Sequence, residues 1–351
     1  MIYDYLIVGQ GIAGSMVAYH ALKRGKNILV IDQSNPRSAS NITTGVINPI
    51  TGRRMSKTWI IDTLIPYARS LYQAIEEEYK IEIFFEQPML RIFSSEVDVE
   101  EWNSKRQTKE YCNYLGNVQQ NYNPSAIQPY GAGEILQSFR VDIPLFIRTF
   151  RTFLQTSNRL LETAFNYEDV QFSDGINYKA IQAERIIFCE GYKAIHNPFF
   201  SSVPLSHAKG ELLEILAPGL NVRTVLNKNI FISPLGDDKY LVGSTFIWDD
   251  TEEKVTDKGR NEITDKLDKM INVPYKIIKE KAGIRPTMPD RRPALGSSKD
   301  NENVYMLNGF GTKGISLAPF FSNHLLEHIE LGNSLLPECD IRRFKKKNYI
   351  R

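Results

Sequence analysis

Residues 1–32 constrain the fold more than any other part of this 351-residue chain. A short apolar run leads into a glycine-rich turn, apolar residues then recur at helical spacing, and a second apolar run follows. This order predicts a β-α-β unit, which favours an α/β fold with a parallel sheet. The expected segments are residues 3–8, 9–14, 12–24 and 27–31.

The turn has the spacing Gly-x-Gly-x-x-Gly at Gly9, Gly11 and Gly14. The first glycine permits a tight turn, the second lets the backbone approach a pyrophosphate, and the third lets the helix pack on the strand. The helix N-terminus offers unpaired N–H groups and a partial positive charge to the phosphates. We therefore expect an adenosine-diphosphate site, with an ordinary turn as the alternative. Its other expected contacts are Ile12, Ala13, Gln33 and the ribose-binding carboxylate of Asp32.

Residues 33–60 form a loop rich in Ser, Asn and Thr, where a dehydrogenase of the NAD type would continue with further β-α-β units. Small hydroxyl residues and glycine suit a loop that lies over the rest of a long, extended cofactor, and FAD is longer than NAD. An ordinary surface loop is the alternative. The expected contacts in this loop are Ser40, Thr43, Thr44, Gly45 and Val46.

A second glycine-rich turn lies near the C-terminus, between an expected strand at 304–307 and an expected helix at 315–331. A helix N-terminus at this turn, aimed at the flavin C2 carbonyl, would favour an anionic reduced ring, and Lys313 would add a full charge. Two such turns suggest the two ends of one ligand, which favours FAD; a helix-capping loop with an exposed lysine is the alternative. The expected contacts here are Gly309, Gly311, Thr312, Lys313 and Gly314, and those after the buried strand at 183–188 are Cys189, Glu190 and Gly191.

The segments typical of a parallel sheet form three separated blocks, with antiparallel strands between them. We expect a Rossmann-like FAD-binding domain, of fold class α/β, with an inserted α+β substrate domain built on an antiparallel sheet. The FAD-binding domain comprises residues 1–80, 140–200 and 283–351, and the substrate domain 81–139 and 201–282. Helices are expected at 60–79, 97–112, 144–154 and 256–270, and a hairpin at 164–180.

Four blocks resemble the D-amino-acid oxidase and glycine oxidase superfamily of FAD-dependent oxidoreductases, and Lys209-Gly210-Glu211 lies between them in family order. The arginine-proline block and the C-terminal glycine block are more specific than the first, which many flavoproteins share. The resemblance implies a flavin at the sheet edge and a substrate domain that covers its ring. The blocks are residues 7–14, 43–46, 282–290 with Pro293 and Gly296, and 308–319.

The resemblance also implies a role for Arg285, which matches the arginine that holds the substrate carboxylate in this family. A guanidinium suits that role because its planar fork matches two oxygens and stays charged; a surface arginine before a proline-fixed turn is the alternative. The family chemistry is hydride transfer from the carbon beside a neutral amine to flavin N5, which depends mainly on substrate orientation. An imine leaves and is hydrolysed by water.

The chain departs from the family in ways that bear on substrate and cofactor. Phe231 stands where glycine oxidases have tyrosine, so a pocket hydroxyl is lost, which argues against glycine as the substrate. No cysteine follows the Arg285-Pro286 turn and no histidine lies in residues 38–50, so we expect FAD to be bound non-covalently. Arg53 and Arg54 have two equal interpretations, contact with an anionic substrate or pairing with surface acids.

The charge distribution argues against a nucleic-acid partner. The net charge is +2, but residues 342–351 contain six basic residues and no acid, so residues 1–341 sum to −4. We interpret the basic tail as a solvated terminus. Three distant cysteines fit neither a disulfide framework nor a zinc site, and His324 and His328 lack a third ligand, so no metal is expected.

No apolar stretch is long enough to span a bilayer and no signal peptide is recognisable, so we expect a cytoplasmic protein without a membrane span. Three functions remain open. The first is an FAD-dependent oxidase or dehydrogenase for a small-molecule amine or amino acid, with O2 or another acceptor such as a quinone. The second is a flavin enzyme of tRNA wobble-uridine modification. The third is a non-catalytic flavin-binding subunit.

Overall fold

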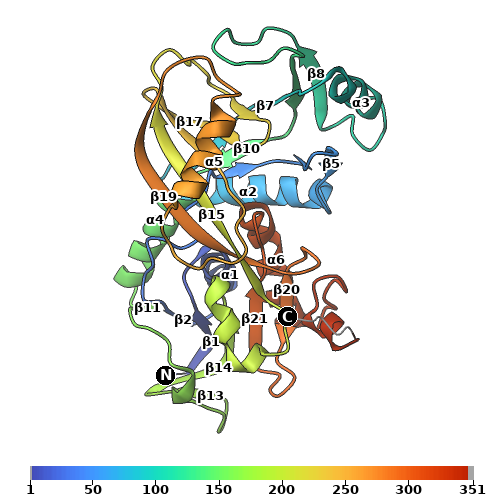
Figure 1. Ribbon diagram of the computed structural model, residues 1–351. Coiled ribbons are helices and arrows are strands. Elements are labelled where there is room, and N and C mark those ends of the chain that lie inside the picture. The colour runs from blue at the N-terminus through green and yellow to red at the C-terminus, as the bar shows by residue number, and fades with distance from the viewer. Residues whose placement is uncertain (1, 347–351) are drawn as a thin grey trace.

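The first sheet joins segments from the start, the middle and the end of the chain. The computed structural model describes residues 2–346, with its N-terminal strand in the lower part of the view in Figure 1. Strands β2, β1, β14 and β21 pair in parallel in that order, so the predicted β-α-β arrangement is confirmed. Their bounds are β1 Ile2–Val8, β2 Ile28–Ile31, β14 Ile181–Phe188 and β21 Val304–Asn308.

Shorter strands extend this sheet on both sides. Strand β11 pairs in parallel with β2, the hairpin β12–β13 adds to the start of β14, and β20 pairs antiparallel with β21. The hairpin turns across residues 173–175 as predicted, but its first strand is short because Asn166 caps a 3₁₀ turn at Tyr167–Asp169. The bounds are β11 Leu160–Leu161, β12 Val170–Gln171, β13 Ile176–Tyr178 and β20 Ala294–Ser297.

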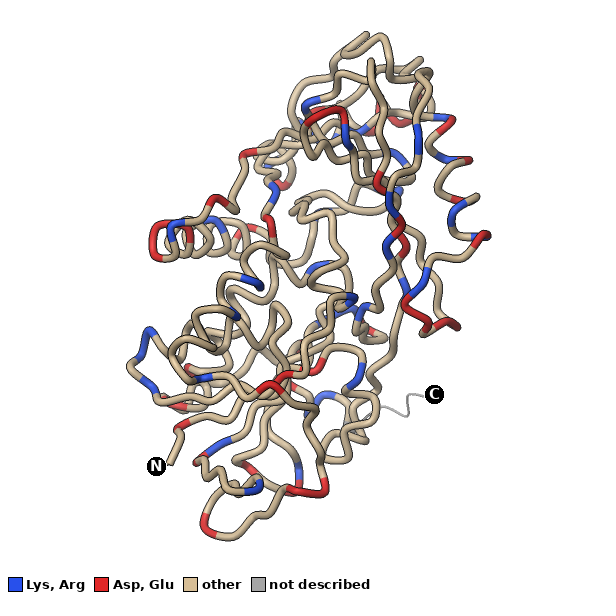
Figure 2. The backbone as a smooth tube through the Cα atoms, turned by 90° about the vertical axis from the view of Figure 1, so that its left-hand side faces the viewer, with Lys and Arg blue, Asp and Glu red and all other residues tan. Residues whose placement is uncertain are grey.

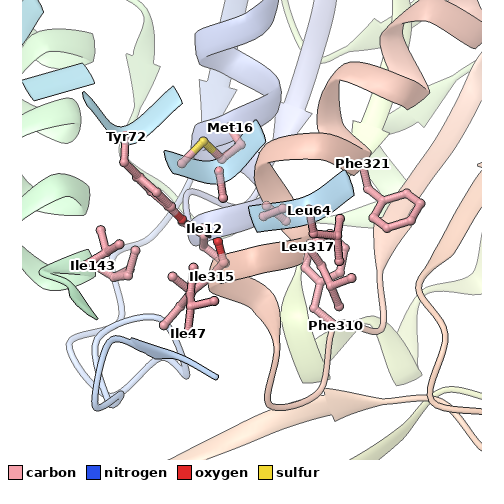
Figure 3. Close-up of a cluster of buried hydrophobic side chains, with 14 of the residues drawn as sticks. Ile12, Met16, Ile47, Leu64, Tyr72, Ile143, Phe310, Ile315, Leu317 and Phe321 are labelled. Carbon is pink, nitrogen blue, oxygen red and sulfur yellow. Dashed lines mark hydrogen bonds between the residues drawn. The ribbon is translucent and has the colours of Figure 1, made fainter. Parts of the chain in front are cut away.

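Helices α1, α2 and α6 meet in one apolar cluster beside this sheet (Figure 3). Ile12 at the start of α1 and Ile315 at the start of α6 both belong to the cluster. The buried Tyr72 hydroxyl of α2 donates to the carbonyl oxygen of Ile315 at 2.7 Å. The N-termini of α1 and α6 are therefore held near each other. The bounds are α1 Ile12–Lys23, α2 Ile61–Tyr79 and α6 Gly314–Leu331.

Helix α4 (Ile143–Thr156) shows why its sequence folds as predicted. Its buried residues recur at helical spacing and include Phe146, Phe150 and Leu154. The Asp142 carboxylate accepts a hydrogen bond from the backbone N–H of Leu145 at 2.9 Å, which caps the first turn. The helix therefore begins where an acidic cap precedes an apolar stripe, and it covers α1.

The second sheet is built almost entirely from antiparallel pairs and forms the upper part of the molecule (Figure 1). Its order is β19-β15-β18-β17-β16-β7-β9-β8, and only the β16–β7 pair is parallel. The long strands β15 and β19 run from this sheet toward the first one. The bounds are β7 Met89–Ile92, β8 Leu115–Gln119, β9 Ala132–Ile135, β15 Ser206–Leu216, β16 Val225–Asn227, β17 Phe231–Gly236, β18 Lys239–Gly243 and β19 Lys276–Thr287.

Two small sheets and two further helices complete the fold. A three-stranded sheet has the order β3-β10-β6, and β4 pairs with β5 as a hairpin. Helix α3 ends earlier than predicted because turns occupy the residues after Arg106, and α5 ends at Leu267. The bounds are β3 Val46–Ile47, β4 Ile50–Thr51, β5 Ser56–Lys57, β6 Phe84–Glu86, β10 Phe139–Val141, α3 Glu96–Arg106 and α5 Asp257–Leu267.

The two large sheets draw their strands from different parts of the chain. The first sheet uses the segments that we propose as the FAD-binding domain, and the second uses those proposed as the substrate domain, except at one boundary. Strand β19 continues across the proposed division at residues 282 and 283. We did not predict this twelve-residue strand, since charged side chains on its exposed edge interrupt the apolar alternation.

Candidate functional site

A cavity of about 2160 Å³ is lined by residues of both large sheets. It brings together the two glycine turns, the loop after β2, the end of β14 and the inner face of the second sheet. Every residue that the sequence predicted for the site lines this cavity, apart from Gly14 and Gly45. Segments from both ends of the chain therefore surround one space.

The β1–α1 turn depends on two glycines for steric reasons. Gly9 has φ +98°, and a Cβ there would lie 2.5 Å from the Cys189 carbonyl oxygen. A Cβ on Gly14 would lie 1.8 Å from the Gly9 carbonyl oxygen. Gly14 therefore serves the close packing of α1 on its strand and does not line the cavity, in agreement with the purpose expected of the third glycine.

The N-terminus of α1 faces the cavity, and no side chain of its N-cap residue caps the backbone N–H groups of the first turn. Gly11 is its N-cap and supplies no side-chain cap, while the Ile12 N–H donates to the Ser40 hydroxyl at 2.9 Å. The loop after β2 is thus tied to the helix N-terminus. The other first-turn N–H groups lie where an anion would be stabilised by the helix dipole. Gly45, with φ +76°, packs against Val141 and shapes the same loop from behind.

Asp32 follows the end of β2, and both of its carboxylate oxygens accept hydrogen bonds while the residue lines the cavity. One oxygen accepts from the Gln10 N–H at 2.9 Å, and the other accepts from the Ser34 N–H at 2.7 Å and from Arg151 at 2.8 Å. Arg151 comes from α4 and also pairs with Glu162. This arginine was missed in the sequence because nothing local indicates a partner 119 residues away.

The residues after β14 pack against the β1–α1 turn. Their carboxylate, that of Glu190, is hydrogen-bonded and is not a free base. Burial raises the pKa of Glu190, although its carboxylate accepts hydrogen bonds from Tyr167 and from Asn197, the latter at 2.8 Å. The Gly191 carbonyl accepts from the Asn308 side chain at 2.9 Å. Strands β14 and β21 are thereby connected beyond the point where their ladder ends.

The C-terminal turn opens the N-terminus of α6 to the cavity. Gly309 and Gly311 have φ +76° and +56°, and the Gly311 N–H donates to the Pro286 carbonyl at 2.7 Å. Lys313 occupies the N-cap without a side-chain cap bond, and its ammonium donates to the Thr58 hydroxyl at 3.3 Å. Contrary to the alternative of an exposed lysine, Lys313 is only half exposed and lines the cavity.

The two turns are neighbours in space. A Cβ on Gly314 would lie 3.4 Å from the Ile12 side chain. Two helix N-termini, with Lys313 beside one of them, therefore face one cavity, and this donor set fits an extended dinucleotide with a diphosphate and a polar ring edge. The residues present are thus suited to FAD.

Lys313 gives a prediction about pH. Burial, with smaller effects of Arg292 and Arg291, lowers the pKa of Lys313 to about 8 from a usual value of 10.5. The folded protein without FAD therefore binds fewer protons at this lysine than the unfolded chain between about pH 8 and 10.5, so its stability rises with pH in that window. We expect Lys313→Met to stabilise the FAD-free protein at pH 7 and to lose this advantage near pH 10, as measured by urea unfolding. A constant difference across the window would contradict the assignment.

Arg285 is an arginine without an acidic partner. Its Nη2 donates to the Ser244 hydroxyl at 2.7 Å and its Nη1 to the Thr245 carbonyl at 3.3 Å. None of the acidic residues within 2–346 forms an ion pair with it, and burial lowers its pKa to about 10. The guanidinium lies over the Phe246 ring, 5.4 Å from its centroid. A partially buried cation with unused N–H donors therefore lines the cavity.

A glycine on the adjacent strand makes room for this guanidinium. Gly210 in β15 lies beside Arg285, and a Cβ on Gly210 would be 1.8 Å from Nη2. The Lys209-Gly210-Glu211 tripeptide thus has a steric reason for its central residue. Its neighbours form a buried ion-pair group, in which Lys209 contacts Glu211 at 3.2 Å and Asp250 at 2.6 Å.

Phe231 and Arg53 line the cavity beyond Arg285, whereas Arg54 does not. Both arginines are exposed, and neither is ion-paired with an acid in the part of the chain that the structure describes. The interpretation of Arg53 and Arg54 as partners of surface acids therefore finds no support. Sequence reasoning missed Ser244, Trp248 and Arg91, which line the cavity from loops or strands without a local motif, and Thr58, which is buried and contacts Lys313.

The start of the basic tail is partly docked, which corrects the interpretation as a solvated terminus for Arg343 and Phe344, whereas Arg342 stays exposed. Arg343 pairs with Asp290 at 2.8 Å, Arg342 contacts Asp340, and the side chain of Phe344 is buried. The rest of the tail, residues 347–351, lies outside the described residues. The buried Phe344 and the Arg343–Asp290 ion pair hold this segment against the rest of the molecule, whereas the Arg342–Asp340 pair is local.

Charge is mixed over the molecule, with basic and acidic segments interspersed along the backbone in Figure 2. Within residues 2–346, no group of three or more His, Cys, Asp or Glu side chains is arranged to hold a metal ion. Over the same residues, no helix is both long and apolar enough to cross a bilayer.

Comparison with known proteins identifies relatives along most of the chain. A family model described as DAO, FAD dependent oxidoreductase, matches residues 4–327. The tRNA 5-methylaminomethyl-2-thiouridine biosynthesis bifunctional protein MnmC of Marinobacter nauticus is 23% identical over 92% of this chain. The chain spans only 55% of that relative's length. Glycine oxidase of Bacillus licheniformis is 24% identical, over 98% of this chain and 96% of its own.

Solved structures with the same fold include two oxidases. Glycine oxidase from Geobacillus kaustophilus has a TM-score of 0.82 at 18% identity, covering 99% of both chains. Iminodiacetate oxidase from Chelativorans sp. BNC1 has a TM-score of 0.77 at 22% identity, covering 95% of this chain and 97% of its own. At these identities the likeness concerns the arrangement of the two sheets and their helices.

Proposed function

Because the chain belongs to the DAO family of FAD dependent oxidoreductases, we propose that it oxidises the C–N bond of an amino acid or of a secondary amine that carries a carboxylate. The observation that carries this proposal is the partially buried, unpaired guanidinium of Arg285 in the cavity wall. A cation in that state is stabilised by an anion, and a carboxylate can accept hydrogen bonds from the N–H groups that Ser244 and Thr245 leave free.

The residues around the cavity divide between cofactor and substrate. The N-terminus of α1 and Asp32 would hold the adenosine-diphosphate half of FAD, and the N-terminus of α6 with Lys313 would face the ring. When bound, the flavin accepts two electrons and a hydrogen from the substrate carbon. FAD is bound non-covalently in this proposal, as expected from the absence of a cysteine after Arg285-Pro286 and of a histidine in residues 38–50.

The chain contributes orientation of the substrate to this reaction. Arg285 binds the carboxylate, while the half-buried Phe231 and the buried Leu212 provide an apolar wall for the rest of the substrate. The substrate carbon loses a hydrogen with its electron pair, the amine nitrogen loses a proton, and water then splits the resulting imine. Oxygen or another acceptor receives the electrons in a separate step.

The experiment is anaerobic reduction of the bound flavin, followed at its visible absorption band, with a panel of amino acids and N-alkyl glycines. We expect bleaching by amines that bear a carboxylate and none by the matching amines without one. Bleaching that is indifferent to the carboxylate would refute the assigned role of Arg285. A yellow protein that no amine reduces would instead favour a non-catalytic flavin-binding subunit.

A second candidate function is flavin chemistry on the modified wobble uridine of tRNA, which the similarity to MnmC favours. A secondary amine bearing a carboxylate would again suit Arg285. Residues 1–341 sum to −4, however, whereas binding to a phosphate backbone requires a basic surface. A salt-sensitive mobility shift with tRNA, weakened by removal of residues 342–351, would make this the preferred function.

A further inference from the structure

The cavity continues past Arg285 along the inner face of the second sheet. Directly paired residues in adjacent strands share a face, and one such row runs Leu212, Gly243, Phe231, Asn227 and Arg91 across β15, β18, β17, β16 and β7. All five residues line the cavity. The row therefore connects the neighbourhood of Arg285 with a distant end at Arg91.

The strands that carry Arg285 and Arg91 are far apart in this sheet. Five strand-to-strand steps of about 4.8 Å separate β19 from β7, so their backbones lie on the order of 24 Å apart. Both Arg285 and Arg91 reach inward from those strands. An amino acid held at Arg285 would leave the far end of the cavity unfilled, because a carboxylate and an amine on one carbon span only a few ångströms.

The far end is cationic. Its lining includes Arg53, Arg91 and Lys228, against the single carboxylate of Asp98, within the part of the chain that the structure describes. Lys57 also lines this region, but it is paired with Asp62 at 2.6 Å. Arg53 and Lys228 make no ion pair with any acid among the described residues. Positive charge is thus in excess around this part of the cavity, where Asp98 offsets part of the charge of Arg91 and Arg53 and Lys228 stay unpaired among the described residues.

Hydrogen bonds of Arg91 fix the position of Arg53 at the cationic end of the cavity. Its guanidinium donates to the carbonyl oxygens of Gly52 at 3.0 Å and Arg53 at 3.2 Å. These bonds dock the tip of the β4–β5 hairpin on the second sheet, with the Arg53 side chain toward the cavity. Arg54, the next residue in the same turn, does not line it.

We propose that this cationic end binds a second anionic group of the substrate, so that the enzyme acts on an amine with one carboxylate near the reacting carbon and a phosphate or carboxylate on a distal arm. The inference rests on the proposed function and specifies its substrate class. Arg285 binds the proximal anion, Phe231 and Leu212 contact the apolar arm, and Arg53 with Lys228 binds the distal anion.

The test uses two sets of probes on the FAD-loaded protein. The first set is N-substituted glycines with an alkyl arm of two to eight methylenes that ends in a phosphonate, a carboxylate or a methyl group. We expect the concentration for half-maximal flavin bleaching to be lower for the anionic arms than for the methyl arm, with an optimum at one arm length. Comparison of phosphonate with carboxylate distinguishes the two possible anions.

The decisive variants are Arg53→Ala and its neighbour Arg54→Ala. We expect Arg53→Ala to raise the half-saturating concentration about tenfold for anionic arms only, as for the loss of one charge-assisted hydrogen bond. Arg54→Ala should leave it unchanged, and Lys228→Ala should repeat the effect of Arg53→Ala. Equal behaviour of the two arginine variants, together with normal bleaching by N-methylglycine, would overturn this inference and leave the proposed function intact.

Binding without turnover separates the two proposals. Alkanoates that carry a terminal phosphonate and no amine cannot be oxidised, and their binding to the FAD-loaded protein is measured by titration calorimetry. We expect tighter binding than for alkanoates of equal length, and Arg53→Ala should remove the difference. A failure of every amine to bleach the flavin, with this difference preserved, would refute the oxidation but support the anion site. No difference would refute the site.

Discussion

Replacing Arg285 with lysine is expected to reduce flavin bleaching by carboxylate-bearing amines by roughly 30-fold or more at subsaturating concentration, which corresponds to about 2 kcal/mol. Lysine keeps the charge but cannot offer two parallel N–H groups to a carboxylate. Its single nitrogen also cannot keep the arrangement in which separate guanidinium nitrogens bond the Ser244 hydroxyl and the Thr245 carbonyl while other N–H groups stay free for the substrate. The measurement is the anaerobic reduction rate as a function of substrate concentration.

Gly210→Ala provides an independent check, because it leaves Arg285 in the sequence. Its added Cβ would lie 1.8 Å from Nη2, so the guanidinium must move away from its present position. We expect the same selective loss for carboxylate substrates, with the flavin still bound. If both variants reduced carboxylate-bearing amines as fast as the unaltered protein, Arg285 would not be the carboxylate-binding residue.

Replacing Gly14 with alanine is expected to yield protein that is purified nearly free of flavin, with affinity for added FAD lowered by roughly 100-fold. The new Cβ would meet the Gly9 carbonyl oxygen at 1.8 Å, and backbone on both sides cannot give way as a flexible side chain would. The helix N-terminus and the turn must therefore separate, although Gly14 itself does not line the cavity. The measurements are the ratio of visible to ultraviolet absorbance and the FAD dissociation constant.

Gly25→Ala is the matched control, at the other end of the same helix. Gly25 has φ +72° and open space around it, so alanine adds only backbone strain of about 1 kcal/mol. We expect a slightly lower melting temperature and normal flavin content. An equal loss of flavin in both variants would mean that general destabilisation of α1, and not the turn, controls cofactor binding.

The local parts of the site were predictable because they depend on short stretches of sequence. Gly9 and Gly14 have steric requirements that arise within one turn and its flanking elements. The parallel order of β2, β1, β14 and β21 followed from the β-α-β pattern and is confirmed. Arg285 was identified by resemblance to the family, not by spacing, since nothing within β19 distinguishes it from a surface arginine.

The parts that escaped prediction are pairings between distant residues. The ion pair of Arg151 with Asp32 joins α4 to the end of β2, and the docking of the β4–β5 hairpin depends on Arg91 in another sheet. Likewise, the sequence allows two equal interpretations of Arg53 and Arg54, contact with an anionic substrate or pairing with surface acids. The structure distinguishes the two residues, because Arg53 lines the cavity and Arg54, its neighbour in the same turn, does not.

Residue types and their short-range spacing were thus enough to assign the α/β class, the two glycine turns and the family. Strand order and register, which place residues hundreds of positions apart on one face, created the cavity, left Arg285 without an acidic partner and gathered Arg53, Arg91 and Lys228 at its far end. The reason is physical: steric limits on a turn act over a few bonds, whereas the environment of a charge depends on every segment packed around it.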